Sequence, residues 1–206
     1  MSPVPILIWS HFKNEQHASP FDDYVAQGKL REIWEGDVTQ HDIEEAPAAI
    51  ITMHIDQNRA VNWLPWFSKL LDRGGRIAIN GHVIRPYLEG VGTYIPAEKV
   101  GKSGLLLTVL GEHPIFEGID RVACGVRKGV AGFYGRGHNQ MPSGAVALTG
   151  VGPAKAPLDW IWQRPAGGEI FSHAGNDIWN ISADEPINRR LTNNLVNWVN
   201  NAQSAS

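Results

Sequence analysis

The sequence predicts an α/β domain in which helices cover both faces of a mainly parallel sheet. Three apolar segments predict buried strands: Val4–Ser10, Ala48–His54 and Arg76–Asn80. Largely apolar runs of this length are typical of strands that are covered on both faces. The chain between them carries helix signals, and strands that alternate with helices form parallel sheets through crossover connections. We therefore expect a three-layer sandwich, with an antiparallel ribbon toward the C-terminus.

The first strand, Val4–Ser10, is followed by a polar loop that contains His11. Ser19 and the proline after it then predict the start of a helix, because serine is a good cap and proline suits the first helical turn. This helix is expected to end near Gly28. The next segment, Leu30–Trp34, is either a short strand or a continuation of the helix, and its residues do not distinguish the two.

The second strand, Ala48–His54, leads into Arg59–Leu71, whose apolar residues recur at nearly helical spacing. Pro65 lies inside this pattern and predicts a kink or a late helix start. Gly74 and the glycine after it end the helix, and the strand Arg76–Asn80 follows. Order and spacing both favour parallel strands up to this point.

The second half of the chain predicts short strands and one long helix. Residues 86–102 are rich in glycine and proline and predict an irregular excursion. A further strand is expected at 104–110. Three short strands separated by turns then predict the antiparallel or mixed ribbon: Ala145–Gly150, Leu158–Gln163 and Gly168–His173. Asp184 precedes a final helix that we expect to extend to about Trp198.

Length and composition favour one ordinary globular domain over residues 1–206. Hydrophobic residues make up 43% of the 206 residues and charged residues 19%. The formal net charge is −3 and no basic run occurs, so nucleic acid is not an expected partner. One cysteine excludes an intrachain disulfide. No signal peptide or membrane-length apolar run is recognised, so we expect a soluble, cytoplasmic protein without a membrane partner.

Four histidines fall at the ends of predicted strands: His11, His54, His82 and His173. The carboxyl ends of parallel strands share one edge of a sheet, where ligands bind. Because histidine exchanges protons near neutral pH, we expect this edge to carry a small-molecule site. Each histidine has a plain alternative role, as a loop residue or a cap on a carbonyl group. The sequence contains no metal-binding motif of paired histidines or cysteines, so no metal is predicted.

Common nucleophile and cofactor motifs are absent from the sequence. It has no G-x-S-x-G elbow, no P-loop and no dinucleotide fingerprint between a strand and a helix. No cofactor is therefore expected. Cys124 lies in the segment VACGV, away from any predicted strand-to-helix turn, and is expected to be a small buried residue without a catalytic role.

The segment GGEIFSHAGNDIW at 167–179 predicts a strand that ends at His173 and a polar turn after it. Asn176 and Asp177 in that turn either orient His173 and bind the hydroxyl groups of a ligand, or are ordinary turn residues. The segment from Tyr134 to His138 contains a cation and a histidine in a glycine-rich loop, which alone indicates no chemistry.

Several of these segments, taken in order, resemble the class I glutamine amidotransferase-like superfold, which is flavodoxin-like in architecture. They are GGRIAINGH, HPIFEGI, GGEIFSHAGNDIW and the final RRLTNNLVNWV, and within the superfold they are most similar to the trehalose-utilisation (ThuA-like) family. Active amidotransferases have a cysteine at the turn after the central strand and a His–Glu pair late in the chain. Here Gly81 and His82 occupy the first place, and His173 has no glutamate two residues further on. The resemblance thus implies a member without the thiol, and without glutaminase activity.

The resemblance also links the chain to sugar metabolism. We therefore expect a ThuA-like protein that binds and transforms a small polar metabolite such as a sugar derivative, with His82 and His173 as catalytic residues. His11, His54, Asn176 and Asp177 are the expected substrate-binding residues. The alternative is a non-catalytic binding or oligomerisation module of the same fold, and a homo-oligomer is compatible with either. The eight tryptophans are compatible with stacking on sugar rings, although most are expected in the core.

Overall fold

The computed structural model describes residues 3–10, 19–98 and 101–204 of the chain. A central sheet of eight strands has the order β2-β1-β3-β4-β12-β11-β10-β6. The bounds are β1 (Ile6–Trp9), β2 (Arg31–Trp34), β3 (Ala48–Ile51), β4 (Arg76–Asn80), β6 (Leu107–Val109), β10 (Val146–Val151), β11 (Ala156–Gln163) and β12 (Glu169–His173). Strands β2, β1, β3, β4 and β12 are parallel, and β11, β10 and β6 add antiparallel pairs. The expected mainly parallel α/β sheet is confirmed. The ribbon β10-β11-β12 continues this sheet, because β12 pairs with β4.

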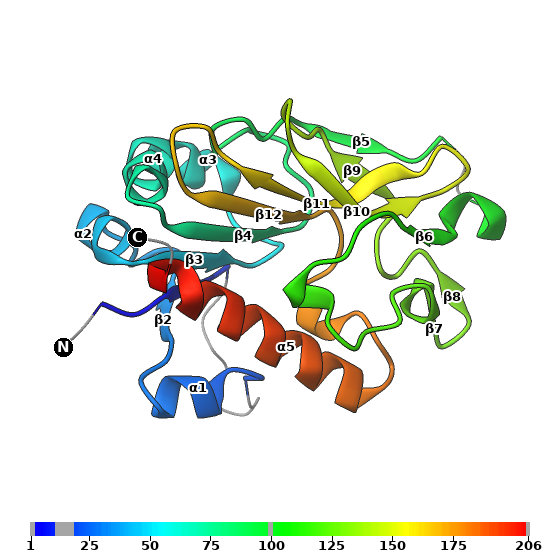
Figure 1. The fold of residues 1–206 in the computed structure, drawn as a ribbon, viewed down its shortest axis with the longest axis horizontal. Coiled ribbons are helices and arrows are strands. Elements are labelled where there is room, and N and C mark those ends of the chain that lie inside the picture. Colours follow the sequence, from blue (N-terminus) through cyan, green and yellow to red (C-terminus); the bar gives the residue numbers. More distant parts are fainter. Residues whose placement is uncertain (1–2, 11–18, 99–100, 205–206) are drawn as a thin grey trace.

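Helices cover both faces of the sheet (Figure 1). They are α1 (Asp22–Ala26), α2 (Gln40–Glu45), α3 (Gln57–Ala60), α4 (Leu64–Asp72) and α5 (Glu185–Asn200). Side chains alternate between the two faces along each strand. In β1, for example, Leu7 packs in the cluster that includes α5, whereas Ile6 and Ile8 pack in the cluster that includes α2 and α4. Three layers result, as the alternation of strands and helices predicts.

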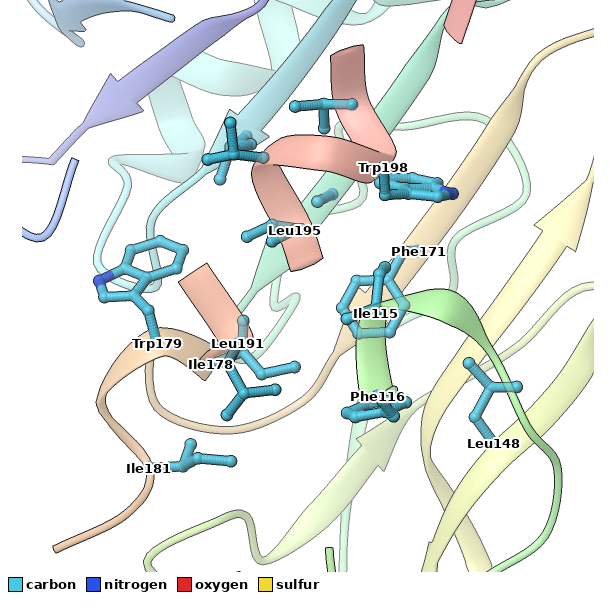
Figure 2. Packing of buried hydrophobic residues seen from close by; sticks show 14 of the residues in the cluster. Ile115, Phe116, Leu148, Phe171, Ile178, Trp179, Ile181, Leu191, Leu195 and Trp198 are labelled. Carbon is cyan, nitrogen blue, oxygen red and sulfur yellow. The ribbon is translucent and has the colours of Figure 1, made fainter. Parts of the chain in front are cut away.

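The core under α5 joins the long helix to the centre of the sheet (Figure 2). Leu191, Leu195 and Trp198 lie on the buried face of α5, and the Trp198 ring meets the Phe171 ring of β12 edge-on at 6.3 Å. Burying a side chain of this size stabilises the fold by about 1.5–3 kcal/mol. This packing fixes β12, and therefore the position of the residues at its carboxyl end.

Local sequence signals explain most helix boundaries. Thr39 caps α2 through a capping box with Asp42. The sequence analysis did not anticipate this helix. The helix expected at 59–71 is divided into α3, a single 3-10 turn at Val61–Trp63, and α4. Pro65 lies in the first turn of α4, so the late start is the correct alternative. The ambiguous segment Leu30–Trp34 contains strand β2.

Two small two-stranded ribbons lie outside the main sheet. Strands β5 (Tyr94–Pro96) and β9 (Gly137–Asn139) form one ribbon, and β7 (Val126–Arg127) and β8 (Val130–Ala131) form the other. Short 3-10 helices at 102–105, 114–116, 123–125, 178–180 and 201–204 fill the connections. Among the described residues, no helix has both the length and the apolar character that crossing a membrane requires.

Candidate functional site

The candidate site is built around the turn that follows β4. Gly81 has φ of +88°, a left-handed conformation that favours glycine, and its N–H donates to the carbonyl oxygen of His173 at 2.9 Å. A Cβ at this position would lie 2.6 Å from the carbonyl oxygen of Met53. The chain can therefore turn sharply here only because residue 81 has no side chain, and this turn presents His82 at the edge.

Two side chains hold this turn in one conformation. The Gln57 amide donates from Nε2 to the His82 carbonyl oxygen at 2.7 Å. Its Oε1 accepts hydrogen bonds from the backbone N–H groups of Ile84 and Arg85. The buried Asn139 donates to the Gly81 carbonyl oxygen at 3.0 Å and accepts from the Val83 N–H at 2.9 Å. Such second-layer hydrogen bonds hold a functional group in one geometry. The backbone under His82 is therefore fixed.

The His82 ring is covered on one face and open on the other. It stacks on Tyr94 of β5 with ring centroids 3.7 Å apart and planes 18° from parallel, while the residue remains exposed to solvent. Loss of solvent on the covered side, and secondarily the charge of His173, lower the pKa of His82 below its ordinary value of 6.5. The imidazole is therefore neutral at pH 7. It can accept a proton at one ring nitrogen and donate the proton that the other nitrogen carries.

Behind His82 lies a fully buried chain of three polar side chains. His173 Nδ1 is 2.5 Å from Asp159 Oδ1, and the Tyr134 hydroxyl donates to Asp159 Oδ2 at 2.6 Å. A carboxylate oxygen only accepts, so Nδ1 carries a proton. Burial, followed by the Asp159 charge, raises the pKa of Tyr134 well above its ordinary value. The register of β11 and β12 creates the chain, because it pairs Asp159 directly with His173.

The free end of this buried chain lies next to Gly175, a residue of the pocket wall. His173 Nε2 is buried and has no hydrogen-bond partner among the described residues. A Cβ on Gly175 would lie 2.7 Å from this nitrogen and 1.8 Å from the Tyr134 carbonyl oxygen. Only glycine fits here. Because Gly175 also lines the pocket that contains His82, Nε2 lies directly behind the pocket wall.

The pocket itself has a volume of about 210 Å³. Its lining comes from loops after β3, β4 and β12 and from the loop before β9: Met53, His82, Gly132, Phe133, Gly135, Arg136, Gly175 and Asn176. A larger hollow of about 660 Å³ opens at the opposite edge of the sheet, near Arg76 and Glu169. We favour the smaller pocket as the site, because it lies at the carboxyl edge of the parallel strands and contains a histidine with a shifted pKa.

The candidate residues from the sequence separate into three groups. His82 and Asn176 line the pocket, and Asn176 donates to the Phe133 carbonyl oxygen at 2.8 Å. His173 lies behind the wall, and Asp177 Oδ1 accepts from the Met53 N–H at 2.8 Å, so Asp177 positions a lining residue. The topology places His54 at the same edge as His82, but His54 is exposed and is not part of the lining. His11 lies outside the described residues.

Sequence analysis assigned no role in the site to Tyr94, Tyr134, Arg136 or Asp159. Tyr134 and Arg136 lie in the glycine-rich loop that alone indicated no chemistry, and the sheet brings this loop over Gly175 through an isolated bridge from Gly135. Asp159 is the one charged residue of a largely apolar strand, and this was the signal that the sequence offered. Nothing in the sequence around Tyr94 indicated a role in the site.

The thiol of Cys124 is not part of the pocket lining. It lies in the 3-10 helix Ala123–Gly125, and burial, followed by the charges of Asp120 and Asp184, raises its pKa to about 11. A thiol with so high a pKa is a poor nucleophile at neutral pH. Among the described residues, no group of three or more His, Cys, Asp or Glu side chains is arranged to hold a metal ion.

Comparisons with known proteins support the fold. No family model matches the chain, and no curated protein matches it. A putative GMP synthase subunit from Thermoplasma acidophilum has a similar structure, with a TM-score of 0.57 and 8% sequence identity over 95% of this chain and 93% of that one. A GH42 beta-galactosidase from G. stearothermophilus aligns with a TM-score of 0.43 and 9% identity, over 95% of this chain and 30% of that chain. The first of these shows that the chain has a glutamine amidotransferase-like α/β fold.

Proposed function

We propose that the chain is a ThuA-like protein that binds and transforms a small polar metabolite, such as a sugar derivative, in the pocket at His82. The observation that carries the proposal is the state of His82. Its backbone is held by Gln57 and Asn139, its ring is stacked on Tyr94, and its lowered pKa keeps it neutral at pH 7. A neutral imidazole at a pocket mouth suits general acid–base chemistry.

The buried chain supports the same role. Asp159 and Tyr134 orient the His173 imidazole so that Nε2 points away from the carboxylate and toward Gly175. We propose that His173 acts through His82 and the pocket wall, because its ring is fully buried. In this role it is a positioning residue that also adjusts the charge around His82.

Glutaminase chemistry is not proposed. The place after β4 that would present a thiol carries Gly81 and His82, and the thiol of Cys124 has a pKa of about 11. Ammonia release from glutamine by the purified protein would contradict this view.

The experiment is a binding and turnover screen with small polar metabolites on three proteins: wild type, His82→Ala and His54→Ala. His54 is the matched control, since it is an exposed histidine after the neighbouring strand and outside the lining. We expect His82→Ala to abolish turnover and weaken binding, and His54→Ala to change neither. In wild type the acid limb of the rate profile should lie below pH 6.5, where His82 takes up its proton.

Two outcomes would count against the proposal. Equal binding by wild type and His82→Ala would remove His82 from the site. Binding that depends on His82 but never leads to turnover would favour the non-catalytic module.

A further inference from the structure

Among the described residues, those that line the pocket carry positive charge and no negative charge. None of the eight lining residues is acidic, and one of them, Arg136, is an exposed cation. Its Nε donates to the Gly132 carbonyl oxygen at 3.3 Å. No carboxylate in the described part of the chain forms an ion pair with Arg136. Its terminal guanidinium nitrogens are therefore available to a ligand.

This arrangement follows from an uneven distribution of charge along the sequence. Residues 121–158 contain five cations and no aspartate or glutamate, although the whole chain has a net charge of −3. Arg127, from the same region, lies with its guanidinium 4.4 Å from the centre of the Phe133 ring, whose residue forms part of the wall. A second positive charge thus lies behind the pocket.

Two carboxylates near the site, those of Asp159 and Asp177, are already engaged. Asp159 accepts from Tyr134 and pairs with His173, with no exposure to solvent. Asp177 accepts from the Met53 N–H and does not line the pocket. Neither reaches Arg136 as an ion-pair partner within 4 Å. Arg136 therefore has no carboxylate partner among the described residues around the pocket.

The position of Arg136 is built into the fold. The Arg136 carbonyl oxygen accepts from the Ala97 N–H at 2.8 Å, just before β9 pairs with β5. The same ribbon carries Tyr94, which stacks on His82, and the Arg136 charge acts on the Tyr94 hydroxyl. Arg136, Tyr94 and His82 thus form one continuous side of the site, held by a single ribbon.

We propose that the pocket binds the anionic group of its ligand, a carboxylate or a phosphate monoester, through Arg136, with His82 in the same lining. This inference rests on the proposed function and narrows its substrate to an acidic polar metabolite. The planar guanidinium fork matches either anion through two parallel hydrogen bonds. A volume of about 210 Å³ suits a small acidic group rather than a large ring system. The unpartnered His173 Nε2 is a buried polar atom next to Gly175, which lines the same pocket.

The test measures by calorimetry the binding of three related probes: D-gluconate, D-glucose 6-phosphate and neutral D-glucose. Acetate and inorganic phosphate serve as minimal anions, and their binding is followed by the shifts of backbone amide signals in NMR spectra. The proteins are wild type, Arg136→Gln, Arg136→Lys and the control Arg189→Gln, whose side chain is exposed on α5. Thermal melts confirm that each variant is folded. The affinities for gluconate and for the phosphate ester, compared with each other, show whether a carboxylate or a phosphate is preferred.

We expect wild type to bind at least one anionic probe about ten-fold or more tightly than glucose, and Arg136→Gln to lose that preference. Arg136→Lys should retain part of it, because it keeps the charge and loses the fork, and Arg189→Gln should match wild type. Raising the salt concentration should weaken the binding of the anionic probes and leave the binding of glucose unchanged. Unchanged anion binding in Arg136→Gln would overturn the inference, as would the absence of any NMR shift at residues 132–136 with tens of millimolar acetate or phosphate.

The two proposals fail in different ways. Ligand binding that is lost in His82→Ala but kept in Arg136→Gln would leave the proposed function standing and refute the anion site. Binding that neither variant weakens would refute both.

Discussion

Removal of a single buried hydroxyl tests whether the His173–Asp159–Tyr134 chain holds the site together. Tyr134→Phe keeps the ring and deletes the donor that lies 2.6 Å from Asp159 Oδ2. A hydrogen bond to a charged group contributes about 1.5–3 kcal/mol, and its loss leaves a buried carboxylate oxygen unsatisfied. We expect the free energy of unfolding to fall by about 2–3 kcal/mol in urea titrations at pH 7, with the denaturant slope unchanged.

The control is Tyr24→Phe. The Tyr24 hydroxyl donates to Asn193 at 3.3 Å on the exposed surface, so its loss should change stability by no more than about 0.5 kcal/mol. Equal effects of the two substitutions would refute the view that the buried chain is a strong, charged network. Binding or turnover that stays normal in a destabilised Tyr134→Phe protein would show that the chain supports the fold alone.

Three further predictions concern stability and reactivity. Gly81→Val should prevent stable folding, because residue 81 has a φ of +88° and a side chain there would contact the Met53 carbonyl oxygen. His82→Ala should keep a stability within about 1 kcal/mol of wild type in thermal melts. If His82→Ala were the more destabilising of the two, His82 would be a structural residue. Burial, then the charges of Arg76 and Arg121, lower the pKa of His113 to about 4, so the folded state resists protonation and stability is lost as the pH falls below 6.5. Between pH 7.5 and 4.5 the loss should reach about 1–2 kcal/mol, a value reduced because water still screens part of the ring. His113→Asn, which keeps an acceptor for the Ile115 N–H, should lose most of that pH dependence in urea titrations; an unchanged profile would assign the effect elsewhere. Cys124→Ser should leave turnover unchanged, and the native thiol should react with a thiol reagent only after unfolding; rapid reaction in the native state would contradict its burial.

Most of the sheet could be predicted from the sequence, because each buried strand is a short, largely apolar segment with a clear end. Arg76–Asn80 matches β4 to the residue, and the three segments of the C-terminal ribbon overlap β10, β11 and β12. Helix α2 was missed because it is only six residues long and has a single buried side chain, Ile43, too few to set up a periodic pattern. The position of β12 beside β4 could not be predicted, since pairing between strands that are far apart in sequence leaves no local signal.

The site was only half visible for the same reason. Strand ends identified the edge and His82, since parallel topology brings such ends together. The residues that complete the site come from the loop at 132–136 and the ribbon at Tyr94, which reach the edge only through tertiary contacts. The tryptophans confirm the plainer of two expectations: Trp63, Trp160, Trp162, Trp179 and Trp198 are buried in the core, and none lines the pocket.

A crystal structure of the protein soaked with the tightest-binding acidic metabolite would test the central claim most directly. We predict density for the ligand in the pocket at the carboxyl edge, within hydrogen-bond distance of the His82 ring and with its anionic group on Arg136. A ligand bound instead in the hollow at the opposite edge, near Arg76 and Glu169, with the His82 pocket empty, would contradict both the site and the function proposed for it.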